Sequence, residues 1–149
     1  MASTLICHMM HIVFSTKERR PLIHADLAPR LYAYVGGIAR QRGCTLLAMG
    51  GIEDHVHILT TLHPNTGLAE FVRDIKSNSS RWMHEEVGVP RFAWQSGYSG
   101  FSVSKSNSAT VARYIGNQRK HHAKKSFKEE LIEFLERHEV EYDPRYVFD

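Results

Sequence analysis

Short apolar runs alternate along the chain with stretches in which apolar residues recur every three or four positions. The short runs end at Gly, Pro or charged residues, a pattern typical of β-strands. The periodic stretches place apolar side chains on one face of a helix. The pattern predicts strands over residues 5–14, 44–50, 55–62, 92–94 and 101–103, and helices over residues 27–42, from the cap Thr66 to Gly88, from Val111 to about His122, and over residues 127–139.

The order of these elements is β-α-β-β-α-β followed by two helices. The first six match the split β-α-β, or ferredoxin-like, pattern, in which helices pack on one face of an antiparallel sheet. We therefore expect an α+β fold, with residues 1–149 forming a single domain. The other face of the sheet would stay open unless a partner or the last two helices cover it. The aromatic tail, residues 142–149, is expected to lie against the body of the domain.

The composition argues against several classes of protein. Of the 149 residues, 42% are hydrophobic and 23% are charged, as in a globular domain that buries a core without disulfides. No run of 18 apolar residues is present, so we expect no membrane span, and we expect no secretory signal. The two cysteines, Cys7 and Cys44, lie far apart in sequence, which favours a reduced, cytoplasmic protein.

The net charge of +3 hides an uneven distribution. Residues 1–128 contain 17 Lys and Arg against 8 Asp and Glu, whereas residues 129–149 contain 2 against 8. Residues 105–128 carry seven basic residues and no acidic one. Such a block indicates a phosphate-bearing partner, although a solvated helix face would have the same composition.

His55 and His57 carry the sharpest local signal. Side chains alternate along a strand, so the two imidazoles point to the same face. Histidines at this spacing can hold one divalent metal, but many such pairs are ordinary surface or hydrogen-bonding residues. A catalytic metal usually has three protein ligands, and the strand itself offers only His63, Asp54 or Glu53 as a third, none of them persuasive.

Tyr114 and Gln118 are four residues apart in the helix expected from Val111 to about His122, and so share one face of it. Basic residues flank them on both sides. A tyrosine beside a narrow apolar stripe usually packs in a core, so this helix alone does not identify a catalytic residue.

Together, these motifs resemble a known family. His55-Val56-His57 is an H-U-H motif, in which U is hydrophobic, and a basic helix with Tyr-x-x-x-Gln follows it. This combination is similar to the single-tyrosine HUH transposases of small prokaryotic insertion sequences. The resemblance covers nearly the whole chain, through residues 14–19, 51–57, 71–76, 94–98, 101–104, 114–118 and 141–143. H-U-H alone is unspecific, whereas the ordered set is highly specific.

The resemblance implies the same ferredoxin-like fold and a role for four residues. His55 and His57 would be metal ligands, Gln118 the third ligand and Tyr114 the nucleophile. The implied metal is Mg²⁺ or Mn²⁺, because glutamine supplies a hard oxygen. The implied reaction cleaves and rejoins single-stranded DNA at hairpins near the element ends, through a 5′-phosphotyrosine intermediate. The family acts as a homodimer, in which each active site takes HUH from one subunit and the tyrosine helix from the other.

Six basic residues are candidates for contacting DNA. Arg113, Arg119 and Lys120 flank the tyrosine and would meet the backbone on either side of the cut. Arg73, Lys76 and Arg81 would line a second basic strip. Each is equally plausible as an ordinary surface charge, and phosphate contacts give little sequence choice.

Three alternatives remain open at this point. The first is a non-catalytic domain that binds single-stranded nucleic acid, for which Tyr114 would be dispensable. The second is a metal-dependent hydrolase that uses His55, His57 and an acidic ligand such as Asp54, and forms no covalent adduct. The third is a domesticated relative that processes repeated palindromes.

Overall fold

A computed structural model describes residues 2–149 of the protein. Four antiparallel strands form one sheet in the order β2-β3-β1-β4. The strands are β1 (Met9–Ser15), β2 (Leu46–Ile52), β3 (His55–Thr61) and β4 (Ser99–Val103). The longer helices are α1 (Ala28–Gln41), α2 (Leu68–Trp82), α3 (Ser108–Gly116) and α5 (Phe127–Arg137), and the shorter ones are η1 (Lys17–Arg19), η2 (Met83–Val87), η3 (Lys105–Asn107) and α4 (Gln118–His122). This arrangement confirms the ferredoxin-like α+β fold with added C-terminal helices.

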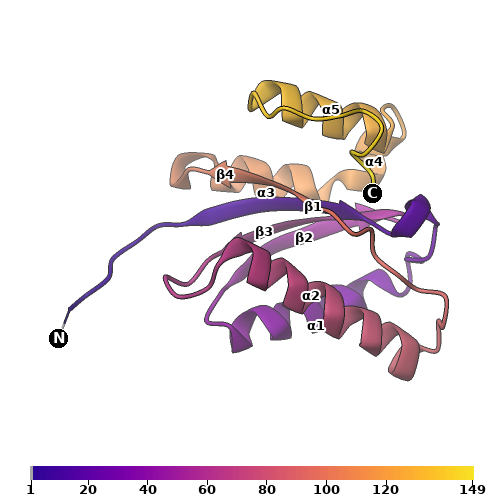
Figure 1. Ribbon diagram of the computed structural model, residues 1–149, viewed down its shortest axis with the longest axis horizontal. Coiled ribbons are helices and arrows are strands. Elements are labelled where there is room, and N and C mark those ends of the chain that lie inside the picture. The colour runs from indigo at the N-terminus through magenta and orange to yellow at the C-terminus, as the bar shows by residue number, and fades with distance from the viewer. Residues whose placement is uncertain (1) are drawn as a thin grey trace.

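The sheet separates two layers of helices (Figure 1). Helices α1 and α2 cover one face, and the main core lies between them and the sheet, around residues such as Ile12, Phe14, Val56 and Ile58. Because side chains alternate along a strand, the intervening residues of β1 and β3 face the opposite side. His55 and His57 are among them, so the pattern of the core sets the direction of both histidines.

Helices α3 and α5 cover the opposite face of the sheet, with α4 between them in the chain (Figure 1). A second, smaller core forms there from Val13, Phe101, Phe127, Leu131 and Leu135. The face that could have remained open is thus covered by the chain's own last helices. The histidines on this face are therefore enclosed by protein.

Several expected boundaries differ from the structure. The first strand begins at Met9, where its pairing with Thr61 and Val103 starts. Ahead of it, the His8 carbonyl oxygen still accepts from the Leu62 N–H at 2.9 Å, but the partner strands β3 and β4 extend no further. Strand β2 runs from Leu46 to Ile52, which shortens the expected turn over residues 51–54 to two residues. Residues 92–94 form no strand and contribute one isolated bridge, between Thr16 and Trp94.

The starts and ends of two helices also differ from the expectation. Thr66 does not cap α2: the cap is Gly67, and the Thr66 hydroxyl donates instead to the Arg42 carbonyl oxygen. The helix expected from Val111 to about His122 is broken at Asn117, whose φ of −102° and ψ of 23° lie outside the helical range. Tyr114 and Gln118 therefore lie on two consecutive short helices, α3 and α4.

The tail lies against the body of the domain, as expected. The carbonyl oxygen of Asp149 accepts hydrogen bonds from the Gly97 backbone N–H at 2.7 Å and from the Gln95 side chain at 2.9 Å. Phe148 contacts Phe127 at the start of α5. Within residues 2–149, no helix has the length and apolar character needed to cross a membrane.

Candidate active site

His55 and His57 project from β3 toward the helices α3–α5, and neither side chain is accessible to solvent. Both rings turn their Nε2 atoms toward the same point. The Nδ1 atom of each ring, on the opposite side from Nε2, contacts a neighbouring side chain. Nδ1 of His55 donates to Asp54 at 2.8 Å, and Nδ1 of His57 lies 2.8 Å from Nε2 of His11 on β1. This is the arrangement that metal-binding histidines usually have, because a partner on one ring nitrogen orients the other toward the ion.

Burial keeps two of these rings neutral. It lowers the pKa of His57 to about 4, and it lowers the pKa of His11 to about 3, with a further contribution from His57. A neutral imidazole is the form that can offer a lone pair to a metal.

Gln118 and Tyr114 join this centre from α4 and α3. The Oε1 atom of Gln118 lies 3.0 Å from Nε2 of His55, and the residue is buried. The ring of Tyr114 is 5.9 Å from the ring of His57, centroid to centroid. The structure thus brings together, within one chain, all four residues to which the resemblance gives a role.

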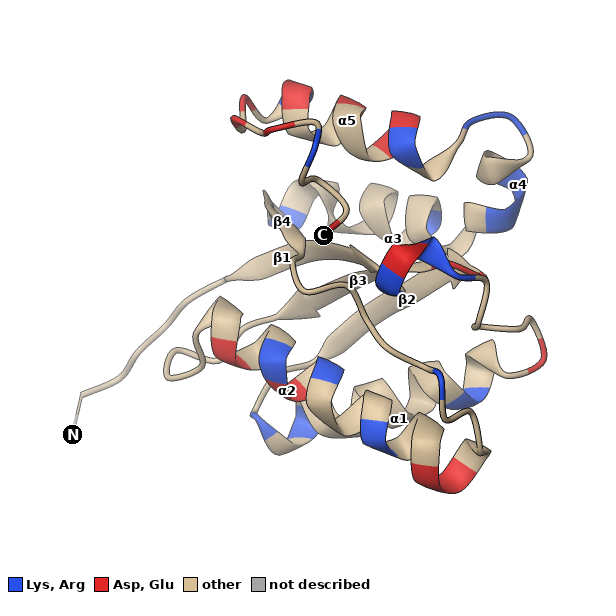
Figure 2. Ribbon diagram, turned by 45° about the vertical axis from the view of Figure 1, so that its right-hand side comes forward, with Lys and Arg blue, Asp and Glu red and all other residues tan. Residues whose placement is uncertain are grey.

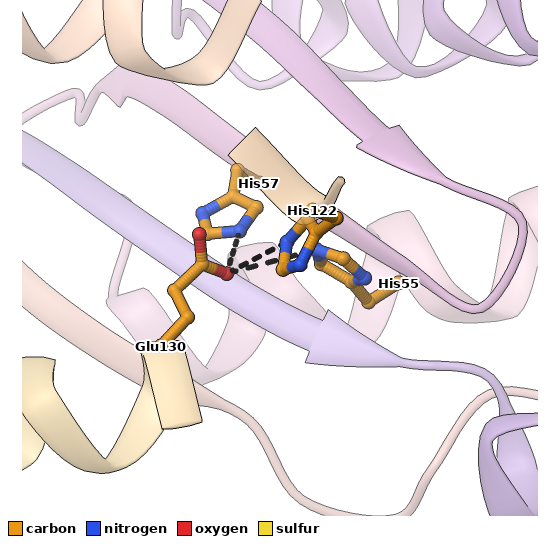
Figure 3. A group of neighbouring side chains, drawn as sticks. All are labelled: His55, His57, His122 and Glu130. Atoms are coloured by element: carbon orange, nitrogen blue, oxygen red, sulfur yellow. Dashed lines mark hydrogen bonds and ion pairs between the residues drawn. The ribbon is translucent and has the colours of Figure 1, made fainter. Parts of the chain in front are cut away.

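Two further residues complete the centre, and the sequence did not point to them. Nε2 of His122, on α4, donates to Oε1 of Gln118 at 2.8 Å, while its Nδ1 donates to the Lys125 carbonyl oxygen at 2.7 Å. The carboxylate of Glu130, on α5, accepts from Nε2 of His57 at 2.9 Å. Figure 3 shows Glu130 reaching from α5 toward His55, His57 and His122.

The carboxylate of Glu130 divides its contacts between its two oxygens. Oε1 faces Nε2 of His57 and lies 3.3 Å from Nε2 of His122 and 3.7 Å from Nε2 of His55. Oε2 accepts a short hydrogen bond from the Tyr114 hydroxyl and lies 3.1 Å from Nε2 of His121. One carboxylate therefore touches both the histidine cluster and the phenol.

These contacts shift the pKa values of three groups. Burial opposes the charge of Glu130, but the hydrogen bonds from His122 and His57 outweigh it and hold the pKa of that carboxyl far below its usual range. Burial also disfavours the charged form of His122, yet its hydrogen bond to Glu130 raises the pKa of that ring. Burial and the hydrogen bond to Glu130 raise the pKa of the Tyr114 phenol well above its ordinary value. The phenol is thus protonated at neutral pH.

The donor atoms fit a divalent cation. One ligand atom each from His55, His57, His122 and Glu130 lies within 4.8 Å of all the others, and the amide oxygen of Gln118 is in the same cluster. Ligand atoms around one small divalent ion are about 3–4 Å apart. Nitrogen and oxygen donors of this kind suit Mn²⁺, Mg²⁺ or Zn²⁺.

The three third-ligand candidates from the strand itself lie outside the cluster. Asp54 contacts the far nitrogen of His55, as described above. Glu53 accepts from Arg119 at 2.8 Å. His63 is exposed beyond the end of β3, where its Nδ1 accepts from the Asn65 backbone at 3.1 Å.

The six basic residues fall into two groups. Arg113, Arg119 and Lys120 are exposed on α3 and α4, on the same side of the sheet as the histidines. Arg73, Lys76 and Arg81 lie on α2, across the sheet from the histidines, where blue segments mark the helix in Figure 2. Lys76 differs from the others because it is half-buried and donates to the carbonyl oxygens of Gln95, Ser96 and Gly97, at 2.6–3.3 Å. Burial lowers its pKa to about 8.

Comparison with known proteins identifies the family. A family model described as "Transposase IS200 like" matches residues 5–118. The match spans most of the chain and includes His55, His57, Tyr114 and Gln118. The chain belongs to the IS200-like transposase family. Transposition of mobile DNA and DNA binding come with this assignment, and α5 lies outside the matched region.

Relatives support the assignment at the level of sequence. The chain is 28% identical over 116 residues to the ISDra2 transposase TnpA of Deinococcus radiodurans, a match that spans 72% of this chain and 81% of the relative. It is 26% identical over 114 residues to the transposase for insertion sequence element IS200 of Salmonella typhimurium, which spans 72% and 74%.

Two solved structures of transposases share the fold. A crystal structure of a Deinococcus radiodurans protein described as a transposase superposes with a TM-score of 0.63 at 27% identity, covering 78% of this chain and 95% of that one. A REP-associated tyrosine transposase bound to a REP hairpin superposes with a TM-score of 0.60, covering 82% and 73%. Its 16% identity makes this second likeness one of fold alone.

Proposed function

We propose that this transposase cleaves and rejoins single-stranded DNA at the ends of its insertion sequence, with Tyr114 as the nucleophile. The observation that carries the proposal is the position of the Tyr114 hydroxyl, which lies beside the cluster of His55, His57 and Gln118 in the same chain. We expect the reaction in the cytoplasm, where the element's DNA is found.

In the first step, the Tyr114 oxygen attacks the scissile phosphorus and the bond from phosphorus to the 3′ oxygen breaks. The 5′ end of one strand becomes a phosphotyrosine, and the other strand leaves with a 3′-hydroxyl. The phenol proton departs toward a group that Tyr114 already faces, either the Glu130 carboxylate or Nε2 of His121 at 3.3 Å. A second 3′-hydroxyl reverses the step, and no nucleotide cofactor is needed because the ester bond is conserved.

We propose that Mg²⁺ or Mn²⁺ binds to His55, His57 and Gln118. When bound, the metal polarises the scissile phosphate and stabilises the charge that develops on it. Asp54 and His11 hold the two imidazoles in the orientation that this requires. The raised pKa of Tyr114 makes such assistance necessary, because the protonated phenol is a poor nucleophile.

We propose two strips of DNA contacts. Arg113, Arg119 and Lys120 lie beside the histidine cluster and would hold the strand being cut. Arg73, Lys76 and Arg81 would hold DNA on the α2 side, and the hairpin at the element end is the duplex we expect there. The REP-associated transposase, which has the same fold, was solved with a REP hairpin bound.

We further propose that the transposase acts as a homodimer with the active site shared between subunits. A single chain already places Tyr114 next to its own histidines, so exchange would require α3 and α4 to move to the partner. Mixing Tyr114→Phe with His57→Ala protein tests this. If the site is shared, a mixed dimer contains one intact site, with the histidines of the Tyr114→Phe subunit and the tyrosine of the His57→Ala subunit, and cleavage is restored. If each site is built within one chain, the mixture stays inactive.

The central test is a denaturing gel of fluorescent single-stranded DNA incubated with the transposase and Mn²⁺. The DNA carries the hairpins from sequences that flank the coding region. We expect a slowly migrating protein–DNA adduct that EDTA abolishes, that Tyr114→Phe loses, and that Tyr146→Phe, a change at an exposed tyrosine, retains. A band shift on a native gel without any adduct would instead identify a DNA-binding domain without cleavage, and release of cut DNA without an adduct would identify a hydrolase.

A further inference from the structure

Glu130 is a buried acidic residue on the otherwise apolar inner face of its helix. It lies on the face of α5 that packs on the sheet, between Phe127 and Leu131, and only 2% of it is exposed. Burying a carboxylate costs several kcal/mol unless a partner compensates for it. A surface role or a role in helix solubility does not account for a glutamate at this position.

The partners of Glu130 do not include a permanent positive charge. Its ion-pair partners are His55, His57, His121 and His122, and no Lys or Arg of residues 2–149 pairs with it. A divalent cation among the same atoms would supply the positive charge that no Lys or Arg side chain brings to this carboxylate.

The geometry around Oε1 of Glu130 is that of a ligand set. Three imidazoles turn Nε2 toward this oxygen, and each has its Nδ1 held by another group: Asp54 for His55, His11 for His57 and the Lys125 carbonyl for His122. Oε2 instead accepts hydrogen bonds from the Tyr114 hydroxyl and, at 3.2 Å, from the side-chain N–H of Gln118, and it lies 3.1 Å from Nε2 of His121 (Figure 3 shows the histidine cluster). One carboxylate oxygen is thus available to an ion while the other holds the phenol.

We propose that Glu130 is an anionic ligand of the divalent metal, in addition to the neutral donors His55, His57 and Gln118. This proposal rests on the metal site of the proposed function and deepens it. The site would then carry one negative charge from the protein, and this charge comes from α5, beyond the region that the family model matches. Because affinity for hard divalent ions rises with the charge of the ligands, Glu130 would hold the metal before DNA arrives.

The test measures Mn²⁺ binding rather than cleavage. Metal-stripped protein is titrated with MnCl₂, and the free ion is followed by its electron paramagnetic resonance signal. The variants are Glu130→Gln, which removes the charge and keeps the shape, and Glu133→Gln, a control one helical turn away at an exposed glutamate paired with Lys125. His57→Ala serves as the variant that removes a ligand of the proposed site itself.

We expect wild type and Glu133→Gln to bind one Mn²⁺ with equal affinity, His57→Ala to lose binding, and Glu130→Gln to bind at least about tenfold more weakly. Binding by Glu130→Gln that equals or exceeds the wild type would overturn the role of Glu130 and leave the metal site standing. Wild type that binds no Mn²⁺ would overturn the metal site and this proposal with it. If Glu130→Gln fails to fold, as judged by circular dichroism, Glu130→Met replaces it, because methionine also lacks the charge and has a similar length. Unchanged Mn²⁺ affinity in that variant would overturn the role of Glu130.

Discussion

The Nε2 atom of His11 lies 2.8 Å from the Nδ1 atom of His57, and both rings are buried on adjacent strands. The contact fixes which nitrogen of His57 faces Glu130. His11 was not among the residues that the sequence singled out, because it lies in the apolar run of the first strand. It acts on the site through another residue rather than by touching the substrate.

Replacing His11 is therefore expected to weaken the metal site. His11→Phe keeps a ring in the space but removes the partner of His57 Nδ1, and the loss of such a partner typically lowers metal affinity by about 10–100-fold. Titration with Mn²⁺ measures this, with His63→Gln as the control at an exposed histidine. Equal affinity in His11→Phe and wild type would show that β3 alone orients His57.

The metal-free protein is expected to lose stability as the pH falls. Burial lowers the pKa of His57 from 6.5 to about 4 and that of His11 from 6.5 to about 3. Below pH 6.5, His11 and His57 become protonated in the unfolded chain but stay neutral in the folded chain. The free energy of unfolding therefore decreases from pH 6.5 down to about pH 3. Glu130, whose pKa is lowered, adds to this loss below about pH 4.5, and His122, whose pKa is raised, opposes it.

Urea unfolding in EDTA at several pH values measures this dependence, which we expect to be on the order of a few kcal/mol. His11→Phe should flatten the curve, because one of the two low-pKa histidines is gone. His24→Gln, at an exposed position, should leave the slope of the wild type unchanged. A slope in His11→Phe as steep as in the wild type would contradict the assignment.

Arg73 and Lys76 share one helix but should respond differently to replacement by glutamine. Lys76→Gln removes an ammonium that donates to three carbonyl oxygens of the segment leading into β4, and we expect a loss of about 2 kcal/mol, or roughly 4–8 °C in the melting temperature. Arg73→Gln removes an exposed charge and should leave the melting temperature unchanged. If Arg73 contacts phosphate, its replacement reduces the salt dependence of DNA affinity by about one unit of slope. Equal melting temperatures for the two variants would show that the Lys76 hydrogen bonds contribute no net stability.

Replacing Gly50 or Gly116 by alanine tests what positions α3 against β2. A Cβ on Gly50 would overlap the Ile115 carbonyl oxygen, whereas a Cβ on Gly116 would meet nothing within 4 Å. Gly50→Ala should therefore push α3 off β2, move Tyr114 and abolish the DNA adduct. Gly116→Ala should keep the adduct and raise stability by about 0.5–1 kcal/mol, because alanine suits a helix better than glycine. An intact adduct in Gly50→Ala would mean that the position of α3 is not set by this contact.

The parts of the site carried by regular patterns could be predicted from the sequence. The alternation along β3 fixed the common direction of His55 and His57, and the order of elements gave the fold. The spacing of Tyr114 and Gln118 suggested one continuous helix, and this was wrong in detail because the chain turns at Asn117. Both side chains nevertheless reach the histidine cluster, Tyr114 from α3 and Gln118 from α4.

Glu130 and His122 were missed for a physical reason. Whether a residue of α5 reaches β3 depends on how the last helices fold back over the sheet, and no local rule predicts that packing. One signal was present in the sequence: Glu130 follows Phe127 by three residues and precedes Phe134 by four, so it interrupts the apolar face of its own helix. An acidic residue in that position requires a partner in the interior.

The match to the family ends at residue 118, but the fold does not. A protein that ended at residue 118 would keep the two histidines of β3, the Gln118 amide and Tyr114. It would lose α5, the helix that covers them. Val13 and Phe101 would then face water, and the imidazoles would be exposed with them. A transposase shortened in this way would keep His55, His57, Tyr114 and Gln118 but would be prone to aggregate. The sheet face that carries the two histidines is also the face that packs in the second core, and without α5 its apolar side chains would be exposed.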